Sequence, residues 1–268
     1  MHQGETGGLL SFSSTLVKIQ DSIFAGTTAP IVGFGRNIIR VEHGELSLED
    51  NCFVGNAAAL TPVLTIGASS SASDTFWQQT YPDEVVPFTN CPFLARGDVP
   101  NGPFSCFMPT SLVTCTAASL TNVTSPLLPC ESTLSDIQRK EAALVNDNVV
   151  RTYILCPNTD YLLGSPLVLT RPNVRILCGA DGQSGNQCIV TGGDVQMKVV
   201  GGAVDINAFV KPLTNLLVHG LTFTQGEGVN VLVQHPCDLT LEQCIFMVRT
   251  IAACKLLLSS YPLHFFEK

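Results

Sequence analysis

The spacing of apolar residues along the chain repeats one short phrase: an aliphatic residue, four further residues, and then Phe. The four copies are Ile19–Phe24, Leu48–Phe53, Val218–Phe223 and Leu241–Phe246. Each copy follows a run in which apolar and polar residues alternate, as in a β-strand with one buried side. The first two copies start 29 residues apart and the last two start 23 apart, a period typical of a stacked supersecondary unit. Because helix signals are scarce, we expect an all-β fold in which each unit is one coil of a β-helix.

The same pattern divides the chain into four segments. Residues 9–67 contain strand candidates separated by Gly and Asn turns, and we predict β-helix coils there. Residues 68–131 are rich in Ser, Pro and Cys, which predicts an irregular linker or insertion, because Pro is excluded from central strands. Residues 132–247 are predicted to hold one helix followed by further coils, and residues 248–268 an irregular C-terminal tail.

The predicted helix runs from Ser135 to Asn146. Ser135 and Gln138 have the spacing of a capping box. Ile137, Leu144 and Val145 fall on one face, so this helix is expected to cover an open apolar end of the stack. An ordinary surface helix is the alternative interpretation.

Two groups of residues carry a resemblance to a known family. The phrases Leu48-Glu-Asp-Asn-Cys-Phe-Val-Gly-Asn56 and Val218-His-Gly-Leu-Thr-Phe-Thr224 resemble coils of right-handed parallel β-helix proteins of the pectin-lyase-like superfamily. The segment from Arg151 through Gly193 is similar to the first coils of large secreted members from algal genomes. The resemblance implies a right-handed parallel β-helix with a capping helix.

The order of these patterns is unusual, because the pattern of helix and first coil lies in the second half of the chain. Two arrangements fit. One β-helix ends and another begins, or a single β-helix carries residues 68–131 as a long insertion. The second is favoured, because a stack of two or three coils has exposed ends and is marginal alone.

Enzymes of this superfamily cleave acidic polysaccharides with carboxylates, or with Ca²⁺ and a basic residue. Asn158-Thr-Asp160 matches one hydrolase motif in letters only, and no Asp-Asp pair exists anywhere in the chain. The chain contains no Cys-x-x-Cys and no His-x-His pair, so the sequence does not indicate a metal site. We therefore assign no catalytic, metal or cofactor residue from the sequence.

The amino-acid composition limits the classes of binding partner that we expect. The chain of 268 residues has 14 Lys+Arg against 22 Asp+Glu, a formal net charge of -8. The low content of basic residues disfavours nucleic acid, whose phosphates need Lys and Arg contacts. No apolar run reaches the roughly 18–20 residues that span a bilayer. An acidic surface also repels polyuronides, so a neutral polysaccharide is the expected partner.

Eleven cysteines favour an oxidising compartment. Cys178 with Cys188 is the preferred disulfide, since nine residues lie between them, and Cys130 with Cys156 is a second candidate. Asn122 begins a glycosylation sequon. An extracellular or cell-surface location is expected, although the chain starts without a signal peptide, which suggests a fragment.

Two functions remain open. The first is a non-catalytic carbohydrate-binding or structural β-helix module, and the alternative is a polysaccharide lyase or glycoside hydrolase. The enzyme is favoured if three or more of seven acidic residues converge in one groove. These are Asp21, Asp50, Asp160, Asp181, Asp194, Asp205 and Glu242.

Overall fold

A computed structural model describes most of the repetitive parts of the chain. The described residues are 7–11, 16–25, 38–54, 63–73, 76–81, 84–87, 93–96, 105–106, 129–144, 148–201, 212–225 and 228–247. For 7–11, 54 and 63–106 the description covers the backbone alone.

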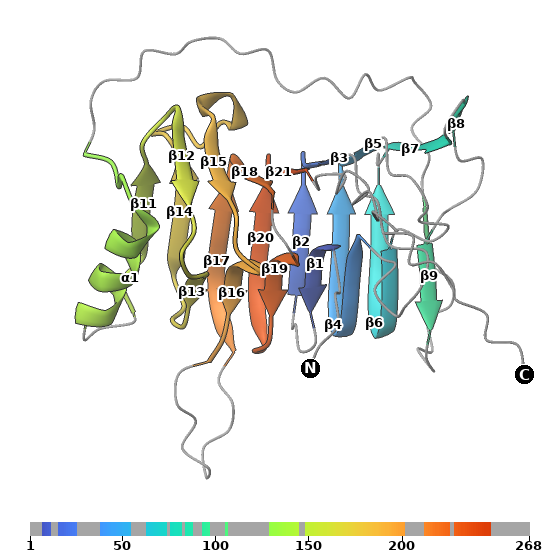
Figure 1. Cartoon of the computed structure of the whole chain (residues 1–268). Coiled ribbons are helices and arrows are strands. Elements are labelled where there is room, and N and C mark those ends of the chain that lie inside the picture. Colours follow the sequence, from blue (N-terminus) through green and yellow to red (C-terminus); the bar gives the residue numbers. More distant parts are fainter. Residues whose placement is uncertain are drawn as a thin grey trace, which may run out of the picture.

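The fold is mostly parallel β-structure with one α-helix (Figure 1). Successive groups of three strands stack on one another, and the described strands pair in parallel except for β7 with β8. This stacking is compatible with a β-helix-like solenoid. The first three coils follow the chain. They are β11 (Arg151–Leu155), β12 (Thr159–Leu162) and β13 (Leu167–Leu169), then β14 (Val174–Cys178), β15 (Cys188–Thr191) and β16 (Val195–Val199), then β17 (Leu213–His219), β18 (Leu221–Thr224) and β19 (Val229–Val233).

The fourth coil is assembled from two distant parts of the sequence. It contains β20 (Cys237–Glu242), β21 (Ile245–Met247) and β1 (Gly7–Ser11), and β1 pairs with β19 on one side and with β4 on the other. The stack continues through the remaining strands. They are β2 (Leu16–Gln20), β3 (Ile23–Ala25), β4 (Ile39–Glu49), β5 (Cys52–Val54), β6 (Val63–Ser73), β7 (Phe76–Tyr81), β8 (Glu84–Pro87), β9 (Phe93–Arg96) and β10 (Ser105–Cys106).

We call β1 to β10 the N block and α1 with β11 to β21 the C block. The two blocks form one stack, but the C block comes first in space and the N block follows it. In Figure 1 the red strand β20 therefore lies beside the blue strand β2.

The repeated phrase forms the core of this stack. All eight of its aliphatic and Phe residues are at most 1% exposed. Phe223, Phe246, Phe24 and Phe53 lie in one column, with successive ring centroids 5.1, 4.6 and 4.5 Å apart. The stacking of Phe24 on Phe53 agrees with the prediction that the repeated phrases belong to stacked units. The column crosses from the C block into the N block between Phe246 and Phe24.

Helix α1 (Leu134–Ala143) lies against the first coil, as the sequence predicted for a cap. Its boundaries differ from the prediction, because Thr133 and not Ser135 is the N-cap: the Thr133 side chain accepts a hydrogen bond from the Asp136 backbone N–H. Leu134, Ile137 and Glu141 are the buried residues of the helix. Leu144 is only half-buried at the C-cap, and Val145 lies outside the described residues.

A buried ion pair fastens α1 to the first coil. The Arg151 guanidinium donates to both Glu141 carboxylate oxygens at 2.7 and 3.1 Å, and also to the Pro172 carbonyl at 2.8 Å. The Tyr153 hydroxyl donates to Glu141 at 2.5 Å. Burial, followed by this bond to the carboxylate, raises the pKa of Tyr153. The partners together satisfy a carboxylate that would be costly to bury alone.

The segment predicted to be irregular contains strands. Residues 68–73, within the Ser-rich run, continue β6 and pair in parallel with the second half of β4. Small Ser and Ala side chains carry little strand propensity of their own, so pairing with the exposed edge of β4 decides their conformation. The predicted tail, 248–268, and the sequon at Asn122 lie outside the described residues.

Candidate functional site

One corner of the stack recurs in consecutive coils, between the 13-stranded and the 8-stranded sheet. Gly220, Gln243, Asp21 and Asp50 occupy it in turn, with φ of 77°, 49°, 49° and 52°. This left-handed conformation suits Gly, and Asp adopts it more readily than most residues. Asp21 and Asp50 are therefore aligned at the surface, at a turn outside the core.

Buried polar side chains lie beneath this corner and form hydrogen bonds with its backbone. The Asn51 side chain accepts a hydrogen bond from the Ser22 backbone N–H at 3.0 Å and donates to the Ile19 carbonyl at 2.8 Å. The Ser22 hydroxyl accepts from the Cys244 N–H at 3.1 Å. These bonds satisfy backbone groups that the turn leaves unpaired, so the corner is held in place.

Carboxylates gather around Asp21. Partial burial, and then the nearby charges of Asp50, Glu242 and Glu49, raise the pKa of Asp21, while His219 acts in the opposite direction. We call Asp21, Asp50, Glu49 and Glu242 the acidic corner. A carboxyl group with a raised pKa beside other carboxylates is one feature of the sites that hydrolyse a glycosidic bond by acid–base catalysis.

The row of residues next to the corner explains why these groups meet. His219, Glu242, Gln20 and Glu49 are register partners on successive strands. His219 Nε2 lies 4.0 Å from a Glu242 oxygen, and among the described residues it has no hydrogen-bond partner. Lys18 pairs with Glu49 at 3.1 Å, with both side chains over a third exposed, so this pair contributes little stability.

Of the seven acidic residues considered from the sequence, Asp21, Asp50 and Glu242 come together, but at an outward turn of the stack and not in the cavity described below. Asp160 lines a cavity at the capped end, and Asp181 accepts a hydrogen bond from the Asn186 side chain. Asp194 lies beside Gly228, and Asp205 is outside the described residues. Glu49 and His219 also lie at the corner, although neither was among the seven. When the repeated phrases are aligned, Glu49, Glu242 and His219 fall at the same position. This position is one residue before the corner.

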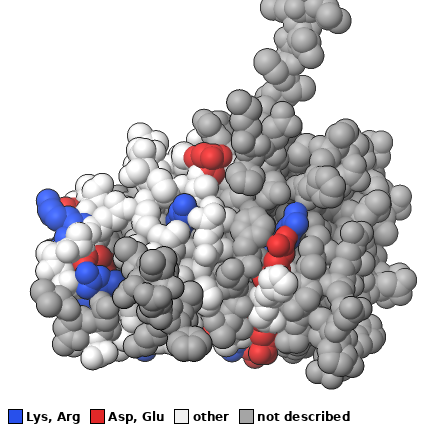
Figure 2. All heavy atoms as spheres, turned by 90° about the horizontal axis from the view of Figure 1, so that it is seen from below, with Lys and Arg blue, Asp and Glu red and all other residues white. Residues whose placement is uncertain are grey.

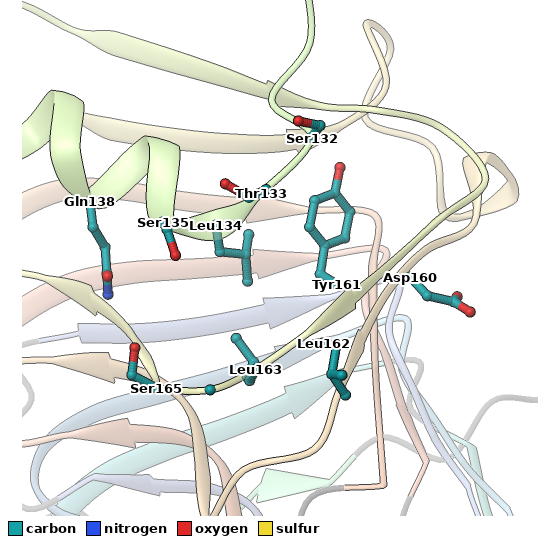
Figure 3. Close-up of a pocket in the computed structure, with 11 residues that line it drawn as sticks. Ser132, Thr133, Leu134, Ser135, Gln138, Asp160, Tyr161, Leu162, Leu163 and Ser165 are labelled. Carbon is teal, nitrogen blue, oxygen red and sulfur yellow. The ribbon is translucent and has the colours of Figure 1, made fainter.

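A cavity of about 220 Å³ lies between the start of α1 and the turn after β12 (Figure 3). Its lining combines hydroxyl and amide groups with apolar side chains, and Asp160 is its one charged residue. The lining residues are Ser132, Thr133, Leu134, Ser135, Gln138, Asp160, Tyr161, Leu162, Leu163, Gly164 and Ser165. Leu162 is 82% exposed, so its side chain presents an apolar surface at the edge of the cavity. The Gln138 amide donates to the Pro166 carbonyl at 2.7 Å, which fixes one side of the cavity.

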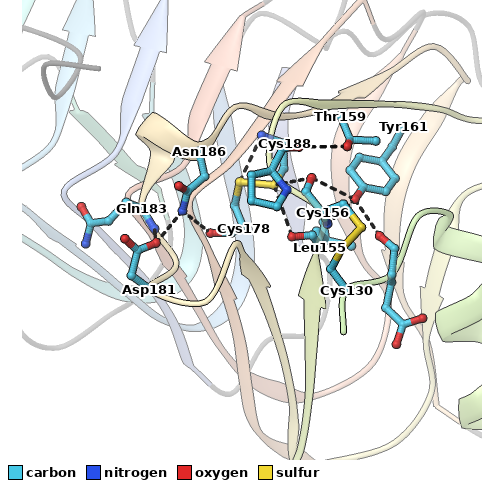
Figure 4. The surroundings of a disulfide bond; sticks show 12 residues. Cys130, Leu155, Cys156, Thr159, Tyr161, Cys178, Asp181, Gln183, Asn186 and Cys188 are labelled. Carbon is cyan, nitrogen blue, oxygen red and sulfur yellow. Dashed lines mark hydrogen bonds between the residues drawn. A yellow bond between two sulfur atoms is a disulfide. The ribbon is translucent and has the colours of Figure 1, made fainter. Parts of the chain in front are cut away.

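Both cysteine pairs put forward from the sequence are joined in the structure (Figure 4). Cys178–Cys188 closes the loop between β14 and β15, and Cys130–Cys156 ties the segment before α1 to the first coil. Tyr161 adds a further link between the first coil and the segment before α1, because its hydroxyl donates a hydrogen bond to the Glu131 carbonyl at 2.8 Å. Cys237 and Cys244 are free thiols, and burial raises the pKa of each to about 12, so they are inert at neutral pH.

Outside the acidic corner, several charged residues on the described surface form ion pairs. On the face seen in Figure 2, several blue side chains lie next to red ones, and one red group stands apart. Arg40 with Glu42 and Arg139 with Asp136 are two such pairs, each at 2.5 Å. Over the described residues, no three His, Cys, Asp or Glu side chains are placed to hold a metal ion. The described helix is also too short and polar to cross a membrane.

No protein-family model matches the chain, and no curated protein or solved structure matches it either.

Proposed function

We propose that this chain is a right-handed parallel β-helix of the pectin-lyase-like type, from a secreted or cell-surface protein that binds a neutral polysaccharide without cleaving it. Coils of three parallel strands and a capping helix support the fold. The two disulfides are compatible with an oxidising location.

The cavity at the capped end carries the proposal of carbohydrate binding. Sugars present hydroxyl groups in the ring plane and C–H groups on the ring faces, so they need hydrogen-bonding groups beside an apolar surface. Ser132, Ser135 and Ser165 supply hydroxyls, while the exposed Leu162 supplies the apolar surface. With Asp160 as the one charged residue in the lining, a neutral sugar fits better than a uronide.

The test is binding to immobilised neutral and acidic polysaccharides, followed by titration of the best oligosaccharide. We expect Leu162→Gln to weaken binding about tenfold, because roughly 1.5 kcal/mol of apolar contact is lost. Met247→Gln is the matched control. Met247 is also exposed and belongs to the same outward row, three coils along, outside the cavity.

Equal affinity for both variants would remove the cavity as the binding site. Retention of polyuronides in preference to neutral glycans would contradict the ligand class.

A second candidate function, a glycoside hydrolase or polysaccharide lyase, is favoured by the acidic corner. Asp21 with its raised pKa would serve as the proton donor, and Asp50 or Glu242 as the second carboxylate. The test is release of reducing ends or unsaturated products from polysaccharides. Activity lost in Asp21→Asn but kept in Asp160→Asn, a carboxylate away from the corner, would establish the enzyme. Absence of product from every substrate would leave the binding module.

A further inference from the structure

The contact between the two blocks is built like any other step of the stack. Strand β20 pairs with β2, β21 with β3, and β19 with β1, all parallel. Backbone hydrogen bonds cross it, for example from the Ile23 N–H to the Cys244 carbonyl at 2.8 Å. We call this contact the joint.

The joint has a well-packed apolar centre. On the C-block side Leu239, Leu241 and Phe246 point inward, and each is at most 1% exposed. On the N-block side the matching residues are also at most 1% exposed, and they are Val17, Ile19 and Phe24. Phe24 and Phe246 stack with ring centroids 4.6 Å apart. Opening the joint would expose these residues together with unpaired strand edges, which readily pair with another chain.

The strands that meet at the joint are not consecutive in the sequence, so no short loop links its two sides. Its two sides belong to residues 7–106 and 129–247, and residues 107–128 connect the blocks. These 22 residues reach at most about 75 Å when extended. Seven strand-to-strand steps separate β10 from β11 along the stack, which is about 34 Å at 4.8 Å a step. The connection is therefore long enough to close the joint within one chain, and also long enough to reach a neighbouring molecule.

We propose that the joint is an exchangeable interface whose second partner is another copy of this chain. In the exchanged form the C block of each copy stacks on the N block of the other, giving a dimer with two complete joints. The three matching strand registers and the Phe column specify the occupant. When the joint is open, the C-block edge of one copy fits the N-block edge of another copy as well as its own. Both forms contain the same contacts, so protein concentration during folding decides between them.

Cross-linking of full-length chains tests the exchange. Lys18 and Thr240 are outward-facing register partners across the joint, whereas Lys18 and Ser47 are outward-facing partners within the N block. Lys18→Cys and Thr240→Cys chains are unfolded in urea with their disulfides intact, mixed, refolded and treated with a short bismaleimide. We expect a covalent species of twice the 28.6 kDa chain mass, increasing with protein concentration.

The matched control mixes Lys18→Cys with Ser47→Cys chains, whose partners are adjacent only within one block. This mixture should give at least fivefold less cross-linked dimer. The double variant Lys18→Cys/Thr240→Cys at low concentration should cross-link within one chain, which checks the joint itself. The proposal is overturned if the double variant cross-links but the mixed chains give no more dimer than the control at any concentration. It is also overturned if the double variant does not cross-link.

Discussion

The corner residues of the two blocks differ, although the core residues beneath them are the same. In the N block the left-handed corner position is Asp21 and then Asp50, whereas in the C block it is Gly220 and then Gln243. All four precede strands whose Phe residues stack in one column. The backbone thus requires a left-handed residue at the corner but not a charge. The carboxylates of the N block are available for another role, which is why the acidic corner is the site of the second candidate function.

The strongest test of the shared core is Phe24→Ala. Phe24 stacks on Phe246 of the C block and on Phe53 of the N block, so its removal leaves a cavity open to both. We expect a loss of about 3–5 kcal/mol in the free energy of unfolding, measured by urea denaturation. Phe53→Ala should cost an amount in the same range. A loss below 1 kcal/mol for Phe24→Ala would show that the blocks do not share one core.

The capped end of the C block is tested by Glu141→Ala. This change leaves the buried Arg151 guanidinium without its carboxylate, and we expect about 3 kcal/mol of destabilisation. Arg139→Ala is the control, because the Arg139 side chain is 77% exposed and forms an ion pair with the nearby Asp136 on the helix surface; it should change stability by under about 0.5 kcal/mol. Similar effects of the two variants would mean that the buried pair does not anchor the helix.

The corner of the C block is tested by Gly220→Ala. A methyl group there would lie 2.0 Å from the Gly182 carbonyl oxygen, on a backbone with φ of 77°. We expect a cost of about 1–3 kcal/mol. Gly185→Ala is the comparison, since its added carbon meets nothing within 4 Å and its φ is not positive. If both variants unfold at the same urea concentration, the corner is not under steric constraint.

The smallest effect is expected from the charge in the N-block corner. The raised pKa of Asp21 means that its protonated form is favoured by folding. Its stabilising contribution is present below its ordinary pKa of 3.8 and is lost as the pH rises through the folded-state value. Asp21→Asn should therefore increase stability more at pH 7 than at pH 3. Urea midpoints at the two pH values measure this difference. An equal change at both would show that the carboxylates of the corner do not interact.

The sequence by itself determined the coil and its core. The alternation of apolar residues identified the strands, and the repeated phrase identified which residues stack, because both depend on neighbouring residues in the chain. The loop disulfide Cys178–Cys188 was predictable for the same reason, since it closes a short segment. The helix was also recognisable, although its N-cap lies two residues earlier than expected, because Thr133 with Asp136 provides the hydrogen bonds that Ser135 was expected to provide.

Only the tertiary structure decided the order of the blocks and the composition of the acidic corner. Strand edges pair by register and not by position in the chain, so β20 finds β2 across more than two hundred residues. That pairing brings Glu242 of the C block to Asp21, Glu49 and Asp50 of the N block. It also gives the strand conformation to the Ser-rich residues of β6, which have little strand preference of their own but lie next to the edge of β4.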